Sequence, residues 1–147
     1  DYSSCGRYFV TICIKDKRCW FGNIIETEED FGTAIRLSKI GNIIEQCWNA
    51  IPEYYGNVSL DARQIMPNHI HGILTIEQQI KKVTLGVVIN QFKAGCTKKI
   101  RNLGCHDFIW QERFHDRIIR NDGELERIRQ YILENPMKWL NGEDRNL

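Results

Sequence analysis

The chemistry that this sequence could perform centres on two histidines, His69 and His71, which stand two positions apart in an apolar run. Residues i and i+2 of a β-strand face the same side, so both imidazoles can meet one metal ion or one phosphate group. The chain has only four histidines, and this pair is half of them. An isolated His-x-His is also common in ordinary packing, and the pair alone favours two partly buried, hydrogen-bonded histidines under a helix.

Spacing excludes several known histidine-based sites. A histidine-triad nucleotide hydrolase needs a third histidine at position 73, which is Ile73 here. Two-histidine phosphoesterases need a second His-x-Thr/Ser motif, which the sequence lacks. Cupin-like metal sites need a carboxylate and a distant histidine, and His106 and His115 match no such pattern. The pair therefore needs a partner of another kind.

A second pair, Tyr131 and Asn135, lies in a segment with helical periodicity. Residues four apart share one face of a helix, so a hydroxyl and an amide oxygen can reach one metal site together. A tyrosine in that position could act as a nucleophile beside the metal. The simpler interpretation makes Tyr131 a core aromatic and Asn135, which precedes Pro136, a helix-stop residue; the sequence alone favours it.

The elements that must position these residues follow from periodicity and turn signals. Alternation or β-branched content predicts strands, and apolar spacing of three and four predicts helices. The predicted strands are 7–14, 19–25, 58–66 and 69–77, with an extended segment at 108–120. The predicted helices are 35–51, ended by Pro52; 83–101; and 121 to about 135, ended by Pro136. This order predicts one α+β domain over residues 1–147, an antiparallel sheet with helices packed on it.

Two local features refine the strand and helix that carry the candidate residues. In the predicted strand 69–77, one face is apolar and faces the core, so the two histidines point away from it. Asn121, with Glu124 three residues on, forms a capping-box pattern that predicts the start of the third helix.

Composition is that of an ordinary soluble protein, with 42% hydrophobic residues, 27% charged residues and a net charge of +1. The six cysteines form no Cys-x-x-Cys pair, so we expect reduced thiols in a cytoplasmic protein rather than disulfides or a zinc site. No apolar run approaches the roughly 20 residues that cross a membrane, so we expect no membrane partner. Because the chain begins at Asp1 without a methionine, we expect that upstream residues have been trimmed.

Four motifs occur in an order that resembles one protein family. They are MPNHIH at 66–71, WQERF at 110–114, IRN at 119–121 and YILENPMKW at 131–139, and segments 1–3 and 6–13 look like the family's first strand. Together they resemble the REP-associated tyrosine transposases, a branch of the single-tyrosine HUH transposases (His, bulky apolar residue, His). The resemblance spans nearly the whole chain.

This resemblance implies a fold, a site and an activity. The fold would be the ferredoxin/RRM-like HUH fold. His69, His71 and Asn135 would be the ligands of Mg²⁺ or Mn²⁺, and Tyr131 would be the nucleophile. The activity would be nicking and strand transfer of single-stranded DNA beside a hairpin, through a 5′-phosphotyrosine. The protein would act at the nucleoid as a monomer or homodimer, and no residue stands out as the general base for the tyrosine.

Basic residues in the second half of the chain are candidates for contacts with the DNA backbone. They are Lys93, Lys98, Lys99 and Arg101 in the second helix, and Arg113, Arg117 and Arg120 after it. For any one of them a solvated surface is the simpler interpretation. His115 and Arg117 depart from residue types frequent in the family, so substrate contacts can differ there. Two alternatives stay open: a replication-initiator or relaxase-type HUH nuclease, and a non-catalytic nucleic-acid-binding regulator of the same fold.

Overall fold

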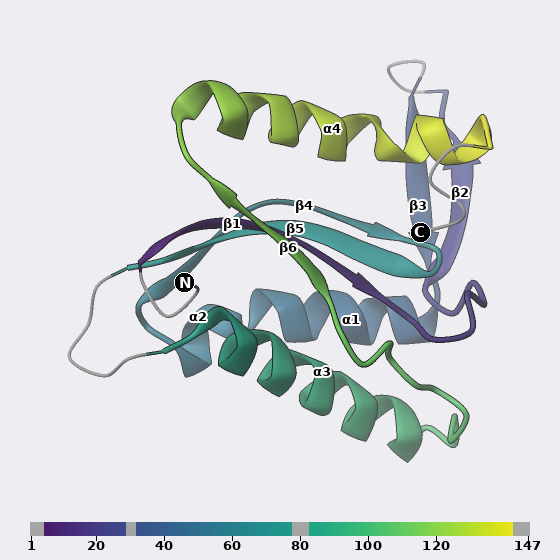
Figure 1. The fold of residues 1–147 in the computed structure, drawn as a ribbon. Helices are drawn as coiled ribbons and strands as arrows, with labels where there is room; N and C mark the ends of the chain where they lie inside the picture. The colour runs from purple at the N-terminus through teal and green to yellow at the C-terminus, as the bar shows by residue number, and fades with distance from the viewer. Residues whose placement is uncertain (1–4, 29–31, 78–82, 143–147) are drawn as a thin grey trace.

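A four-stranded antiparallel sheet forms the centre of the protein (Figure 1). The computed structural model describes residues 5–28, 32–77 and 83–142, so the predicted motif segment 1–3 lies outside the described residues. The sheet has the order β4-β5-β1-β6. Its strands are β1 (Gly6–Cys13), β4 (Val58–Met66), β5 (His69–Ile76) and β6 (His115–Ile119). The predicted α+β class with an antiparallel sheet is confirmed.

Helices cover both faces of this sheet (Figure 1). Helices α1 (Lys39–Asn49), α2 (Ile51–Tyr54) and α3 (Leu85–Asn102) lie on one face, and α4 (Asp122–Leu140) crosses the other. The predicted second helix is confirmed, with Thr84 as its N-cap residue. In the described part of the chain, no helix is long and apolar enough to cross a membrane.

Both faces of β5 are buried. The sequence predicts burial of the apolar face only. Ile70, Leu74 and Ile76 face the larger core beneath α1 and α3. The opposite face carries Ile73, which belongs to a smaller core with residues of β6 and α4. The histidines lie on this second face, as predicted. They are nevertheless fully buried, because Trp139 and Tyr131 of α4 pack against His69 and His71 respectively.

The region before α1 differs from prediction. Strand β2 (Gly22–Glu26) pairs with β3 (Thr33–Leu37) in a separate two-stranded ribbon that stands beside the C-terminal end of α4 (Figure 1). The helix predicted from Ile35 is therefore wrong in its first residues. Ser38 caps α1 by accepting a hydrogen bond from the Gly41 N–H at 3.0 Å, which fixes the helix start after β3.

Two other boundaries also differ. The predicted extended segment 108–120 is a regular strand only in β6, with one isolated bridge between Ile14 and Trp110. The predicted end of the last helix near Asn135 is wrong, because α4 continues through Pro136 to Leu140. A proline in a helix interior removes one backbone hydrogen bond, and Pro136 is buried, so its packing works against that loss.

Gly72 lies on the face of β5 that packs against α1, beside Ile70 and Leu74, and a substitution there tests how closely the helix approaches the strand. A Cβ atom at Gly72 would lie 2.4 Å from Cζ2 of Trp48, a fully buried side chain of α1. We expect Gly72→Ala to lower the free energy of unfolding by roughly 1–3 kcal/mol, the usual cost of overpacking. Denaturant titration measures this change.

Gly95 in α3 is the matched control, because a Cβ there would meet nothing within 4 Å. Gly95→Ala should raise the free energy of unfolding by about 1 kcal/mol, since alanine is the better helix former. Equal effects of the two substitutions would show that Trp48 does not constrain β5.

Candidate active site

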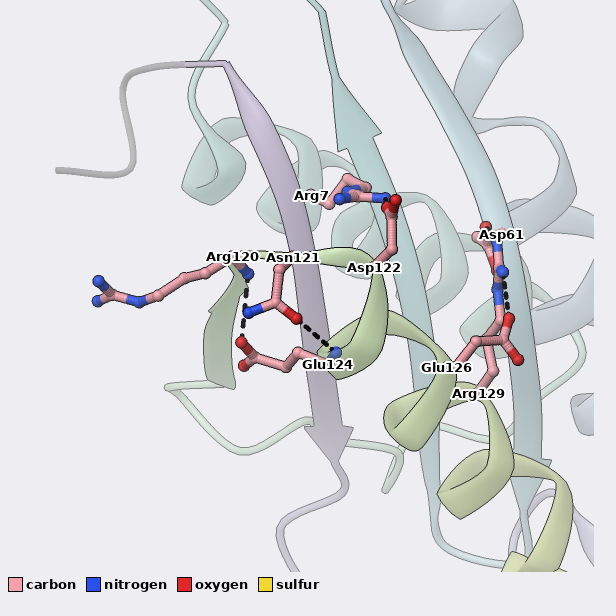
Figure 2. Close-up of polar contacts among 8 residues, drawn as sticks. All are labelled: Arg7, Asp61, Arg120, Asn121, Asp122, Glu124, Glu126 and Arg129. Carbon is pink, nitrogen blue, oxygen red and sulfur yellow. Dashed lines mark hydrogen bonds and ion pairs between the residues drawn. The ribbon is translucent and has the colours of Figure 1, made fainter.

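Ion pairs to two strands of the sheet, β4 and β1, fix helix α4 across it (Figure 2). Arg129 donates from Nε to Asp61 Oδ1 at 2.8 Å and from Nη2 to Asp61 Oδ2 at 2.6 Å. Asp61 lies where the register of β4 shifts, and such bulges redirect side chains. Near the start of α4, Arg7 of β1 lies 3.2 Å from Asp122. Two different strands therefore hold the helix in one orientation.

The start of α4 is fixed by the capping residues predicted from the sequence (Figure 2). The Asn121 side chain accepts a hydrogen bond from the Glu124 N–H at 2.8 Å. The Glu124 carboxylate accepts one from the Arg120 N–H at 3.3 Å and pairs with Arg117 of β6 at 2.8 Å. A buried carboxylate in the first helical turn also interacts favourably with the helix dipole.

This orientation brings all four predicted site residues together. The Tyr131 and His71 ring centroids lie 5.6 Å apart in an edge-to-face arrangement. Asn135, one turn further along α4, is fully buried beside His71. The rings of His69 and His71 are 4.7 Å apart. Tyr131 is neither a distant surface residue nor a fully buried one, since its side chain is partly exposed.

The hydrogen bonds of His69 fix which of its nitrogens carries the proton. Its Nδ1 lies 2.7 Å from the Asn68 side-chain oxygen, which can only accept, so Nδ1 carries the hydrogen. The Asn68 amide nitrogen donates to the Lys17 carbonyl at 3.2 Å, which holds the amide in that orientation. His69 Nε2 is therefore left with a free lone pair, and it lies 3.2 Å from His71 Nε2.

Thr11 on the neighbouring strand β1 allows His71 to adopt either tautomer. Its Oγ1 lies 2.8 Å from His71 Nδ1, and a hydroxyl can donate or accept. When Thr11 donates, His71 Nε2–H bonds to His69, and the pair is satisfied by a proton. When Thr11 accepts, the two Nε2 lone pairs face each other, an arrangement that a cation stabilises. The same geometry thus accommodates either a proton or a metal ion.

Both histidines are held neutral at pH 7. Burial lowers the pKa of His69 to about 3, with a smaller contribution from the neighbouring His71. Burial also lowers the pKa of His71 to about 4, and the Asn135 side chain works against this shift. Neutral imidazole is the form that binds metal ions, so the electrostatics suit the role that the sequence predicts.

The residues present fit a divalent cation. Two nitrogens 3.2 Å apart have the separation of adjacent ligands on one ion with bonds of about 2.1 Å. Asn135 donates from Nδ2 to the Tyr131 carbonyl at 2.6 Å. Its buried Oδ1 forms no hydrogen bond of ordinary length and angle, although the side chain lies near enough to His71 to raise the pKa of that residue. No cluster of three or more His, Cys, Asp or Glu side chains able to hold a metal occurs among the described residues. The candidate set is therefore two imidazoles and one amide oxygen.

Tyr131 faces a cavity of about 420 Å³ between β6 and α4. On another side of its ring, the Lys138 ammonium lies 4.6 Å from the ring centroid. The sequence analysis missed Lys138, Asn68 and Thr11 as parts of this site. Asn68 adjoins the histidine motif and could have been found, whereas Thr11 becomes visible only through its pairing with His71 across β1 and β5.

The basic residues of α3 lie on the face of the sheet opposite to α4 (Figure 1). Lys93 donates to the carbonyls of Gln111 and Glu112 at 2.7 and 3.3 Å, and Arg101 donates to that of Phe108 at 3.2 Å. These two side chains hold the segment before β6 against α3. Further basic residues are exposed: Lys98, Lys99, Arg113, Arg117 and Arg120. Of these, only Arg117 lines the cavity beside Tyr131.

Two sequence relatives from Haemophilus influenzae resemble this chain over most of its length. An uncharacterized protein is 35% identical, and the alignment covers 95% of this chain and 84% of the relative. A second protein, named "Putative REP-associated tyrosine transposase", is 25% identical over 94% of this chain and 74% of that protein. No family model matches the chain.

Two solved structures share the fold. A REP-associated tyrosine transposase bound to a REP hairpin superposes with a TM-score of 0.66 at 19% identity, covering 90% of this chain and 67% of the other. A "putative transposase" from Deinococcus radiodurans gives a TM-score of 0.56 at 14% identity, covering 90% and 92%. At these identities the structures establish the similarity of fold.

The lowered pKa values predict how the stability of the metal-free protein depends on pH. The unfolded chain binds protons at its histidines near pH 6.5, whereas His69 and His71 in the folded protein stay neutral to about 3 and 4. Their contribution is therefore complete above pH 6.5 and is lost progressively as the pH falls. We expect the free energy of unfolding, measured by urea titration in EDTA, to fall between pH 7 and pH 5.

His71→Gln should make this pH dependence shallower, because one of the two lowered groups is removed. His106→Gln is the matched control, since His106 is exposed and lies outside the site. A pH dependence unaltered by His71→Gln would contradict the assignment of a buried, neutral His71.

Proposed function

Because the chain resembles a putative REP-associated tyrosine transposase over most of its length and shares the fold of a REP-associated tyrosine transposase, we propose that it nicks and rejoins single-stranded DNA beside hairpins. The intermediate would be a covalent link between Tyr131 and a DNA 5′-phosphate. His69, His71 and Asn135 would hold the divalent cation, Mg²⁺ or Mn²⁺, on which the reaction depends.

One observation carries this proposal. The Tyr131 ring packs edge-to-face on His71, at 5.6 Å between centroids, while the buried Asn135 oxygen lies on the same side of α4. A structural tyrosine would not require two neutral imidazoles and an amide oxygen without a regular hydrogen bond at its side. Burying such polar groups is costly unless something binds them.

The reaction follows from the nucleophile and its surroundings. The Tyr131 oxygen would attack the scissile phosphorus, forming the O–P bond as the bond to the 3′-oxygen breaks. The departing strand takes up a proton and keeps a free 3′-hydroxyl. Tyrosine is a weak nucleophile when neutral. The Lys138 ammonium, 4.6 Å from the ring centroid, places a positive charge beside the attacking group. A 3′-hydroxyl attacking the phosphotyrosine would reverse these steps and join strands.

A divalent cation, when bound, supplies positive charge that polarises the phosphate and stabilises its developing charge. The two imidazoles provide nitrogen ligands, which Mn²⁺ tolerates better than Mg²⁺, and Asn135 Oδ1 provides an oxygen. Phosphate oxygens of the substrate would complete the coordination.

The proposed substrate is a DNA hairpin with a single-stranded flank. The solved relative with this fold is bound to a REP hairpin, which supports a hairpin partner. The protein would work at the nucleoid, as a monomer or a homodimer.

A labelled-oligonucleotide assay tests the nucleophile. Hairpin oligonucleotides labelled at the 5′ or the 3′ end are mixed with the protein and Mn²⁺ and separated in SDS. We expect an SDS-resistant adduct that carries the 3′-end label only, and its loss in EDTA. Tyr131→Phe should abolish the adduct, at least a thousandfold, while hairpin affinity changes little.

Tyr54→Phe is the matched control, because Tyr54 is 67% exposed on α2 and lies outside the site. It should leave the adduct unchanged. An adduct that survives Tyr131→Phe would contradict the nucleophile assignment. Hairpin binding by the wild type without any adduct would instead favour the non-catalytic regulator.

We propose contacts with the DNA phosphate backbone for the basic residues that have no ion-pair partner among the described residues. Lys98 and Lys99 of α3 are such residues, as are Arg113 and Arg120 near β6. Replacing Lys98 and Lys99 with alanine should reduce the slope of log affinity against log salt by roughly 2, since each phosphate contact contributes about 0.9. Anisotropy titrations at several salt concentrations measure the slope. An unchanged slope would show that this side of α3 does not contact DNA.

A further inference from the structure

The cavity beside Tyr131 has the composition of a site for a nucleobase. Its volume is about 420 Å³, and its walls come from β1, β6 and α4. Phe9 and Ile128 form an apolar surface, and Tyr131 also lines the cavity. The polar groups come from Thr11, His115, Asp116, Arg117, Glu124 and Arg127. Resting on the proposed function, we propose that this cavity holds one unpaired base of the DNA strand, flanking the phosphate that Tyr131 attacks.

Phe9 provides the stacking surface and fixes the position of the base relative to the chemistry. Its half-buried ring lies 6.0 Å from the Tyr131 ring, edge-to-face, and 5.5 Å from the His71 ring. A base stacked on the exposed part of Phe9 is therefore next to the nucleophile and one ring away from the histidine pair. Aromatic stacking accepts any base and stabilises single-stranded DNA against withdrawal from such sites.

Some polar side chains around the cavity already have an ion-pair or hydrogen-bond partner, and others are available to bind a nucleotide. Glu124 is occupied by Arg117 at 2.8 Å and by the Arg120 N–H. Arg127 and His115, by contrast, are exposed and make no hydrogen bond or ion pair within the described residues. The available groups include the donor fork of Arg127, which suits the acceptor edge of a base or the phosphate of the same nucleotide. They also include Asp116 Oδ2, a buried acceptor without a hydrogen-bond partner, which suits an amino group on a base edge.

The position of β6 explains how a strand of DNA reaches the cavity. β6 is the last strand of the sheet, and within residues 5–28, 32–77 and 83–142 no further strand pairs with it beside His115 and Arg117. An extended single strand can lie along this edge with one base turned inward. A duplex cannot present a base in this way without unpairing it, which agrees with a single-stranded flank as the part that enters.

An abasic scan tests this proposal. Hairpin oligonucleotides with a single abasic residue at successive positions of the flank are titrated against wild-type protein in EDTA, where no cleavage occurs. We expect one position to weaken binding about tenfold, in line with the loss of one stacked base. That position should adjoin the phosphate found in the adduct.

Two variants test whether the loss of affinity caused by the abasic residue, the abasic penalty, arises in the cavity. Arg127→Ala changes an exposed side chain and should fold normally, and Phe9→Leu keeps an apolar residue against the second core. Each should bind intact hairpin more weakly and show a reduced abasic penalty. Lys98→Ala is the matched control, because a backbone contact should weaken all the oligonucleotides equally and leave the penalty unchanged.

A flat abasic scan would overturn the proposal, and so would a full penalty that persists in both cavity variants. This failure can be told apart from failure of the proposed function. A flat scan with an intact adduct contradicts the cavity assignment alone. A position-specific penalty without any adduct contradicts the nicking activity alone.

Discussion

The packing of α4 across the histidine face of the sheet is the constraint on which the rest of the structure depends. Without it, His69 and His71 would be two polar residues on the open face of a central strand. The bidentate pair between Arg129 and Asp61, formed at the bulge of β4, sets the direction of the helix. The smaller core, which contains Ile73 and residues of β6 and α4, packs the helix against the sheet. Tyr131 and Asn135 meet the histidines because of this orientation.

Burial of the two histidines has two consequences, one for their charge and one for their hydrogen bonds. It keeps both imidazoles neutral, which is the state that binds a cation. It also requires that every polar atom has a partner, which Asn68 and Thr11 provide for the two Nδ1 atoms. Because β5 is a central strand, paired on both edges, the ligands are held by backbone that has little freedom to move. Among the described polar atoms of the histidines, Tyr131 and Asn135, the exception is Asn135 Oδ1, which is buried without a regular hydrogen bond.

Local signals in the sequence predicted most of the elements. Strands β4 and β5, the extent of α3 and the capped start of α4 follow from alternation, apolar spacing and the Asn121–Glu124 pattern. Strand β3 was missed because Ile35 continues the apolar spacing of α1, and the cap at Ser38 decides the boundary. The end of α4 was misjudged because tertiary packing outweighs the cost of one proline.

The candidate site was predictable in part. The i, i+4 relation of Tyr131 and Asn135 places them on one helical face. The resemblance to a transposase family predicts that both residues share one site with the two histidines. Which face of the sheet α4 would cover depends on contacts far apart in the sequence, such as Asp61 with Arg129. The pairing of Thr11 with His71 and the cavity beside β6 depend on sheet register and strand order, which no short motif encodes.

The central claim is that the buried histidine pair and the tyrosine of α4 act as one site. Its most direct test is mass spectrometry of the covalent protein–DNA product formed with a hairpin oligonucleotide and Mn²⁺. The account predicts that a peptide containing Tyr131 carries the DNA 5′-phosphate, and that His69→Ala or His71→Ala removes this product. A DNA-linked peptide that contains Tyr54 or Tyr55 instead, or a Tyr131 adduct unaffected by loss of both histidines, would contradict it.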